Sequence, residues 1–117
     1  MSPSRPSSTI IGQRLRERRE QLGWSLERVG VSIGLDESTA RARISRYELG
    51  IHQPPEQTTL LMAAVLSVPL AFLNCDDDQL AEIILAASRL PSNDQEQLLK
   101  SLRIRLDELR SGNSSTG

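Results

Sequence analysis

The sequence predicts an all-α protein, and three observations on its 117 residues support that class. No segment alternates apolar and polar residues with the period of two that a half-buried strand requires. Runs of β-branched residues are also absent. Instead, glycines and prolines separate short segments whose apolar residues recur every three or four positions, a spacing typical of amphipathic helices.

The first two predicted helices are short, and each ends at a glycine. The first spans about residues 9–22 and stops at Gly23. The second is capped by Ser25, continues to about Ile33 and stops at Gly34. Serine suits the cap position because its hydroxyl accepts a hydrogen bond from a backbone N–H group that has no partner within the helix.

The third predicted helix begins after Asp36, a good N-cap residue, and ends at Gly50. Glu37 lies in its first turn, where the helix dipole favours an acidic side chain. No further acid occurs before Glu48. Three arginines lie between these two glutamates: Arg41, Arg43 and Arg46.

A loop, an apolar helix and a very short helix follow. Two prolines exclude a helix from the segment 51–57. We predict a buried helix at about 57–66 and a short one at 69–73, which opens with a proline. The apolar stretch 60–73 is shorter than the roughly 20 residues of a membrane-spanning helix, so we interpret it as core.

Two more helices are predicted at about 77–90 and 92–109. The three aspartates at 76–78 suit a helix N-terminus, and the spaced ligands of a calcium loop are missing. Residues 92–95 form a capping-box pattern. Four leucines of the last helix are spaced 3-4-3: Leu99, Leu102, Leu106 and Leu109. This seam spans less than two heptads, so it packs either on the domain's own core or on a second copy.

The sequence contains no arrangement of residues typical of an enzyme active site. The single histidine, His52, has no neighbouring cysteine or acid, and glycine-rich phosphate loops and nucleophile motifs are absent. We expect no enzyme, no metal and no cofactor, and no small-molecule effector is indicated. The lone Cys75 fits a reducing cytoplasm, and the N-terminus has no apolar segment typical of a secretory signal. We therefore expect a cytoplasmic protein with no membrane partner.

The charge is unevenly distributed. Residues 1–50 contain nine basic and six acidic side chains, whereas residues 51–117 contain five basic and nine acidic ones. The small net charge of −1 therefore combines a basic half with an acidic half. A basic half favours a polyanionic partner.

The predicted helices at 25–33 and 36–50 have the arrangement of a helix-turn-helix, whose second helix enters the major groove of DNA. Helical spacing turns Ala40, Ile44 and Tyr47 inward. The outward residues, with Arg43 at the flank, are Arg41, Ala42, Ser45 and Arg46. Arginine can pair with O6 and N7 of guanine and neutralise phosphates, and alanine lets the backbone approach the bases.

The stretch 11–73 resembles the lambda-repressor-like, Cro-type (XRE-like) helix-turn-helix family. The matching residues are Gly12, Leu15, Arg16 and Arg19, then Leu22 to Ser25, Ile44 to Glu48 with Gly50, Pro54 and Pro55, Ala63, Leu66, Val68, Pro69, Phe72 and Leu73. The resemblance implies a five-helix DNA-binding domain that reads double-stranded DNA through its third helix as a homodimer on a roughly palindromic site. It also implies a structural ion pair between Arg19 and Glu48.

Three departures from the family pattern bear on function. Leu26 stands where the family often has glutamine, so a phosphate contact is not expected there. Gly30 replaces the usual small alanine. Glu48 follows Gly34 by 14 positions, against about ten in the family, and the difference is close to one turn of 3.6 residues. The addition forms either an extra helical turn or a longer inter-helix turn, and in the first case Ser38 and Thr39 join the candidate DNA contacts.

The sequence thus predicts a five-helix DNA-binding domain with two additional C-terminal helices. We expect a flexible arm at 1–8, the DNA-binding domain at 9–74, a dimerising helical pair at 75–110 and a disordered tail at 111–117. The expected function is a transcriptional regulator, specifically a bacterial or phage-like repressor. The alternative is a protein-interaction or antitoxin-like adaptor that uses the same basic face.

Overall fold

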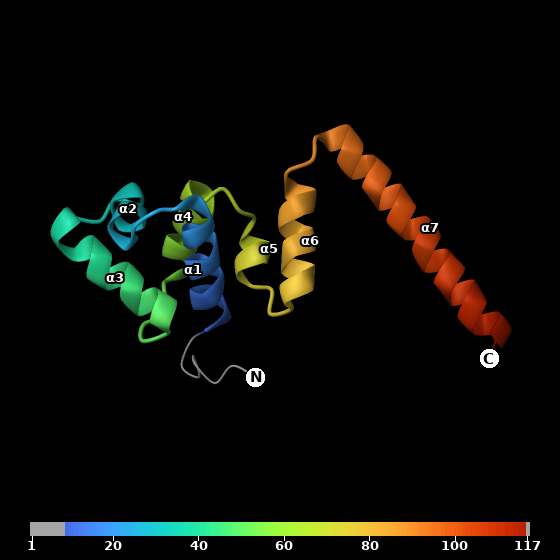
Figure 1. The fold of residues 1–117 in the computed structure, drawn as a ribbon, viewed down its shortest axis with the longest axis horizontal. Coiled ribbons are helices and arrows are strands. Elements are labelled where there is room, and N and C mark those ends of the chain that lie inside the picture. The colour runs from blue at the N-terminus through green and yellow to red at the C-terminus, as the bar shows by residue number, and fades with distance from the viewer. Residues whose placement is uncertain (1–8, 117) are drawn as a thin grey trace. The chain divides into compact units, whose positions relative to one another are not determined.

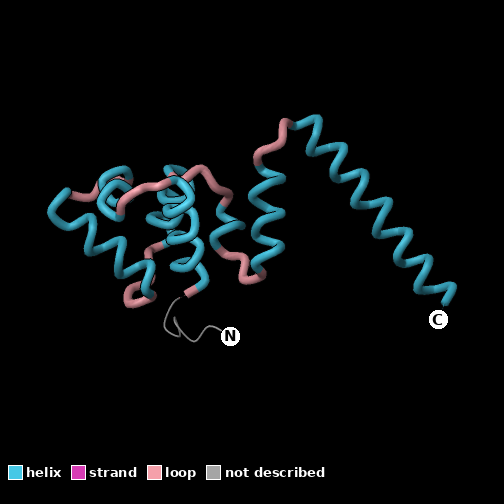
Figure 2. The backbone as a smooth tube through the Cα atoms, in the orientation of Figure 1, coloured by secondary structure: helices cyan, strands magenta, loops and turns pink. Residues whose placement is uncertain are grey.

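The computed structural model describes residues 9–116, and their side chains through Gly112. The expected flexible arm at 1–8 and Gly117 lie outside the described residues. Every regular element of the described part is a helix (Figures 1 and 2), which confirms the all-α class. The helices are α1 (Ile10–Leu22), α2 (Leu26–Ser32), α3 (Glu37–Leu49), α4 (Glu56–Val65), α5 (Leu70–Leu73), α6 (Asp78–Ser88) and α7 (Ser92–Thr116).

The chain divides into two compact units, residues 1–85 and 86–117. The first unit extends beyond residue 74, where the DNA-binding domain is expected to end, because α6 packs on this unit through Ala81, whose exposed fraction is 1%. The last three residues of α6, 86–88, belong to the second unit together with α7.

One hydrophobic core holds the first unit together. Within it, α1 lies between α3 and α5 and contacts both (Figure 1). Every helix from α1 to α6 contributes at least one buried side chain: Leu15, Val29, Ile44, Tyr47, Met62, Ala63, Leu66, Val68, Phe72, Leu73 and Ala81 are the apolar members. The apolar stretch 60–73 therefore supplies a large part of the core, as its composition predicted.

Local capping sets both ends of α1, the start of α2 and the end of α3, whereas Asp36 precedes α3 without a side-chain cap hydrogen bond. The Oγ atoms of Thr9 and Ser25 accept hydrogen bonds from backbone N–H groups in the first turns of α1 and α2. Gly23 and Gly50 end α1 and α3 in the left-handed conformation, which glycine adopts without the steric cost other residues meet.

Two close helix contacts position α3. A Cβ atom on Gly12 of α1 would lie 2.6 Å from the carbonyl oxygens of Tyr47 and Glu48. A Cβ atom on Gly30 of α2 would lie 2.5 Å from the Cβ of Ala40. Neither position has room for a side chain, so glycine allows both α1 and α2 to lie directly against α3. The Gly30–Ala40 contact also explains why glycine replaces the family's alanine.

The additional residues before the arginines form a helical turn. Helix α3 begins at Glu37, with Asp36 as its N-cap residue. The backbone carbonyl of Asp36 accepts hydrogen bonds from the N–H groups of Thr39 and Ala40. Because Ala40 is buried against α2, this first turn is part of the packed domain.

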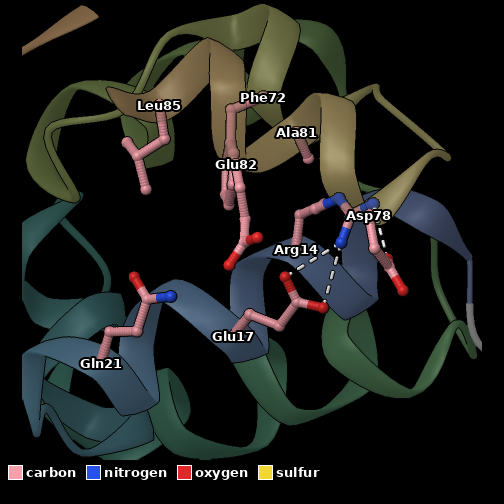
Figure 3. A pocket seen from close by; sticks show the side chains of 8 residues that line it. All are labelled: Arg14, Glu17, Gln21, Phe72, Asp78, Ala81, Glu82 and Leu85. Carbon is pink, nitrogen blue, oxygen red and sulfur yellow. Dashed lines mark hydrogen bonds and ion pairs between the residues drawn. The ribbon is translucent and has the colours of Figure 1, made fainter. Parts of the chain in front are cut away.

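The start of α6 uses two of its three aspartates. Asp77 Oδ1 accepts a hydrogen bond from the N–H of Leu80 and so caps the helix. Asp78 forms an ion pair with Arg14 of α1. The sequence predicted helix capping for the three aspartates. Asp77 has this role, whereas Asp78 joins α6 to α1 (Figure 3).

Two expectations for the second unit were wrong. Residues 92–95 do not form a capping box, because Ser92 is already helical and Gln95 Nε2 donates a hydrogen bond to the carbonyl of Ala87. The helix also does not end near Leu109 but continues through most of the tail, to Thr116. Gly112 disfavours a helix but does not end it here, since its φ is not in the left-handed region. Among the described residues, no helix has the length and apolar character of a membrane span.

Candidate nucleic-acid interface

Helix α3 has one face in the core and one face in solvent. Its buried residues are Ala40, Ile44, Tyr47 and Glu48. The candidate DNA-contacting residues lie outside this set: Arg41, Ala42, Arg43, Arg46, Ser38 and Thr39 are exposed, and Ser45 is half-buried. The structure therefore brings all seven together on the solvent side of one helix.

The arginines of α3 are available to a partner. Among the described residues, none of the guanidinium groups of Arg41, Arg43 and Arg46 forms an ion pair within the chain. Glu48 is buried and bonded to Arg19, and the exposed Glu37, four positions before Arg41, forms no ion pair with it. The solvent face of α3 consequently carries a net positive charge.

Arg19 of α1 and Glu48 of α3 form the ion pair that the family resemblance implied. The Arg19 Nε and Nη2 atoms donate hydrogen bonds of 2.6 and 3.0 Å to the two carboxylate oxygens, and Nη1 donates to the carbonyl of Trp24. The hydrogen bond to Glu48 raises the pKa of Arg19 and outweighs the opposing effect of burial. This two-pronged contact fixes the end of α3 on α1.

The first turn of α2 carries a feature that we did not anticipate. Leu26 packs against the core, and the Ser25 hydroxyl is used as a helix cap. Arg28, by contrast, is exposed and stacks on the Trp24 ring, with 4.1 Å from its Cζ to the ring centroid. Trp24 lies before the N-cap of α2 and outside the helix, so helical spacing could not have predicted this stack.

The four leucines of the predicted seam are exposed on α7. Leu99, Leu102, Leu106 and Leu109 have exposed fractions between 45% and 64%. On α6, Leu80 and Ile83 are exposed to 49% and 51%. Each of these helices therefore carries exposed apolar side chains.

A model of the helix-turn-helix domain matches residues 10–83. The chain belongs to the helix-turn-helix domain family. Residues 10–83 cover α1 to α5 and the first half of α6, so the family match extends beyond the stretch that carried the sequence resemblance.

Among solved structures, this helix-turn-helix protein is similar to one described as the crystal structure of transcriptional regulator BswR. The two chains are 38% identical, with a TM-score of 0.76, over 79% of this chain and 91% of the other. No curated protein matches the chain. The family match and this structure confirm the lambda-repressor-like, Cro-type resemblance that the sequence motifs indicated.

Proposed function

We propose that this helix-turn-helix protein is a sequence-specific DNA-binding transcriptional repressor. The observation that carries the proposal is the solvent face of α3. Its three arginines form no ion pair with the residues that the structure describes, and α1 and α2 hold the helix in place. Membership of the helix-turn-helix family and the similarity to a transcriptional regulator support it.

Arg41 and Arg46 are the proposed base readers, because a guanidinium can donate two hydrogen bonds to one guanine. Arg43 lies at the flank and is assigned to the phosphate backbone. Ala42 and Ser45 are small and allow the α3 backbone to approach the base edges. Ser38 and Thr39, on the additional first turn, complete the proposed contact surface, since the N-terminal residues of a recognition helix reach the bases.

We further propose that the protein binds a roughly palindromic operator as a homodimer. One recognition helix contacts too few base pairs to be selective in a genome, and two copies double the site. The exposed leucines of α7 support a second copy as the partner, because four apolar side chains at 3-4-3 spacing match a two-helix interface.

The test is a pair of double variants with the same change of charge. The operator is first selected from a random DNA pool with the wild-type protein. Arg41→Ala combined with Arg46→Ala should reduce the preference for the operator over random DNA by at least about 30-fold, since each lost bidentate contact costs ~1–3 kcal/mol. The control combines Arg16→Ala with Arg89→Ala, which lie outside α3.

If the α3 double variant discriminates as well as wild type, the assignment of the readers is wrong. If the wild-type protein selects no DNA sequence at all, the function is instead that of a protein-interaction or antitoxin-like adaptor, whose acidic partner would meet the same arginines.

A further inference from the structure

Arg28 of α2 is an exposed arginine that is held in a defined place. Its Cζ atom lies 4.1 Å from the centroid of the Trp24 ring. Its backbone N–H donates a 3.0 Å hydrogen bond to Ser25 Oγ, which fixes the first turn of α2. Within the part of the chain that the structure describes, no ion pair joins Arg28 to an acid, the neighbouring Glu27 included. The charge of this arginine is therefore available to an anion.

The Trp24 ring that carries Arg28 is connected to α3. Trp24 is half-buried and packs against the core. Its carbonyl accepts a 3.0 Å hydrogen bond from Nη1 of Arg19, whose Nε and Nη2 bond the Glu48 carboxylate of α3. Arg19 thus holds Trp24 and the end of α3 together. Arg28 consequently lies on a support that is joined to the helix with the candidate DNA contacts.

Arg28 also lies near the basic face of α3. A Cβ atom on Gly30 would be 2.8 Å from the Cα of Ala40, so α2 and α3 touch at this point. Arg28 precedes Gly30 by two residues, and Arg41 follows Ala40 directly. Helix geometry therefore places the Cα atoms of Arg28 and Arg41 no more than about 14 Å apart. A duplex bound to α3 presents several phosphates within that distance, since it carries one charge per ~1.7 Å of its axis.

A stack and a phosphate contact use different parts of a guanidinium. In a stack the aromatic ring meets the face of the group, whereas the N–H donors lie in its plane and point outward from its edge. Arg28 can therefore keep its stack on Trp24 while it donates two hydrogen bonds to one phosphate. Because the stack already restricts the side chain, less conformational entropy is lost when the phosphate binds.

We propose that Arg28, stacked on Trp24, binds a phosphate of the DNA backbone beside the site read by α3 and adds affinity without sequence preference. The proposal rests on the proposed DNA-binding function and extends the contact surface from α3 to α2. Discrimination between sequences remains with the arginines of α3. Phosphate contacts carry no direct sequence information, so the two roles can be measured separately.

The experiment measures Kd for the selected operator and for random DNA of the same length over a series of salt concentrations. Arg28→Ala should lower the slope of log affinity against log salt by about one for each protomer bound. The corresponding loss of affinity is about eightfold per protomer at about 0.1 M salt, equal for both DNAs, and vanishes near about 1 M salt. Because the Arg28 side chain is exposed, the fold should persist, which circular dichroism checks.

Arg89→Ala is the control for this variant. It removes the same charge at an exposed arginine that lies outside α1, α2 and α3. It should keep the wild-type affinity and the wild-type salt slope.

Trp24→Leu tests the stack. Leucine keeps an apolar side chain against the core but offers no ring, so the charge of Arg28 stays while its position is no longer fixed. The salt slope should keep its wild-type value, and the affinity should fall about threefold because the side chain must now be ordered on binding. In the Arg28→Ala background, Trp24→Leu should cause no further loss. Equal losses in the two backgrounds would show that Trp24 acts without Arg28 and would overturn the inference.

An Arg28→Ala variant with the wild-type salt slope would refute the phosphate contact while the proposed function stands. A loss of affinity confined to the operator would also refute it, because Arg28 would then read bases. If the wild-type protein binds neither DNA, the proposed function fails, and this inference fails with it.

Discussion

At the scale of single residues, α3 depends on a few side chains that never face solvent. Glu48 is 5% exposed, and both of its carboxylate oxygens are bonded to Arg19. Its role is to hold α3 against α1, whereas Arg41, Arg43 and Arg46 point to solvent, where a partner can reach them. One glutamate within a basic helix is thus a structural residue.

Glu48→Ala should destabilise the protein by roughly 3–5 kcal/mol, because it leaves the mostly buried Arg19 without its anion. The measurement is the free energy of unfolding from urea titration followed by circular dichroism. Glu20→Ala is the matched control, since the Arg16–Glu20 pair is exposed and contributes about 0–1 kcal/mol. Equal stability of the two variants would contradict the role given to Glu48.

At the scale of helices, the predictions were good where a pattern repeats and poor where a tertiary contact decides. The limits of α1 to α5 follow from caps, glycines and prolines, and each lies within two residues of its expected position. The additional turn of α3 could not be distinguished from a longer loop, because the same residues suit both. The burial of Ala40 against Gly30, a tertiary contact, decides it.

Gly30→Ala should destabilise the first unit by roughly 1–3 kcal/mol, since the new methyl group would overlap Ala40 and push α2 away from α3. Differential scanning calorimetry measures the effect. Gly112→Ala is the control, because a Cβ there meets no atom within 4 Å and alanine favours a helix. A Gly30→Ala variant that melts at or above the wild-type temperature would show that α2 and α3 can separate without cost.

The sequence allowed the candidate contact residues of α3 to be named, but not the long-range contacts within the domain that carries them. All seven proposed contacts on α3 could be named because helical spacing separates inward from outward positions. The contacts of Arg14 with the carbonyl of Cys75 and with Asp78 could not be found in this way, since these two partners lie far from Arg14 in the sequence. No local pattern encodes such a contact.

At the scale of the whole molecule, the exposed leucines predict how the protein assembles. Leu102→Glu combined with Leu106→Glu should convert the proposed dimer into a monomer, because two charges would be buried in an apolar interface. Sedimentation velocity measures the mass, and affinity for the full operator should fall while half-site affinity persists.

Ile104→Glu is the control for this variant. Ile104 lies on the same helix and is exposed to 61%, but helical spacing places it on the face opposite the leucine seam. It should leave the mass unchanged. Dimers that survive the double leucine variant would locate the interface elsewhere in the chain.

The division of α3 into two sets of residues has an evolutionary consequence. Ala40, Ile44, Tyr47 and Glu48 hold the helix, and none of them belongs to the proposed contact set. A mutation at an outward position therefore changes recognition with little effect on folding. Descendants of this gene could acquire new target sites one substitution at a time, and an engineer could exchange the outward residues while keeping the scaffold.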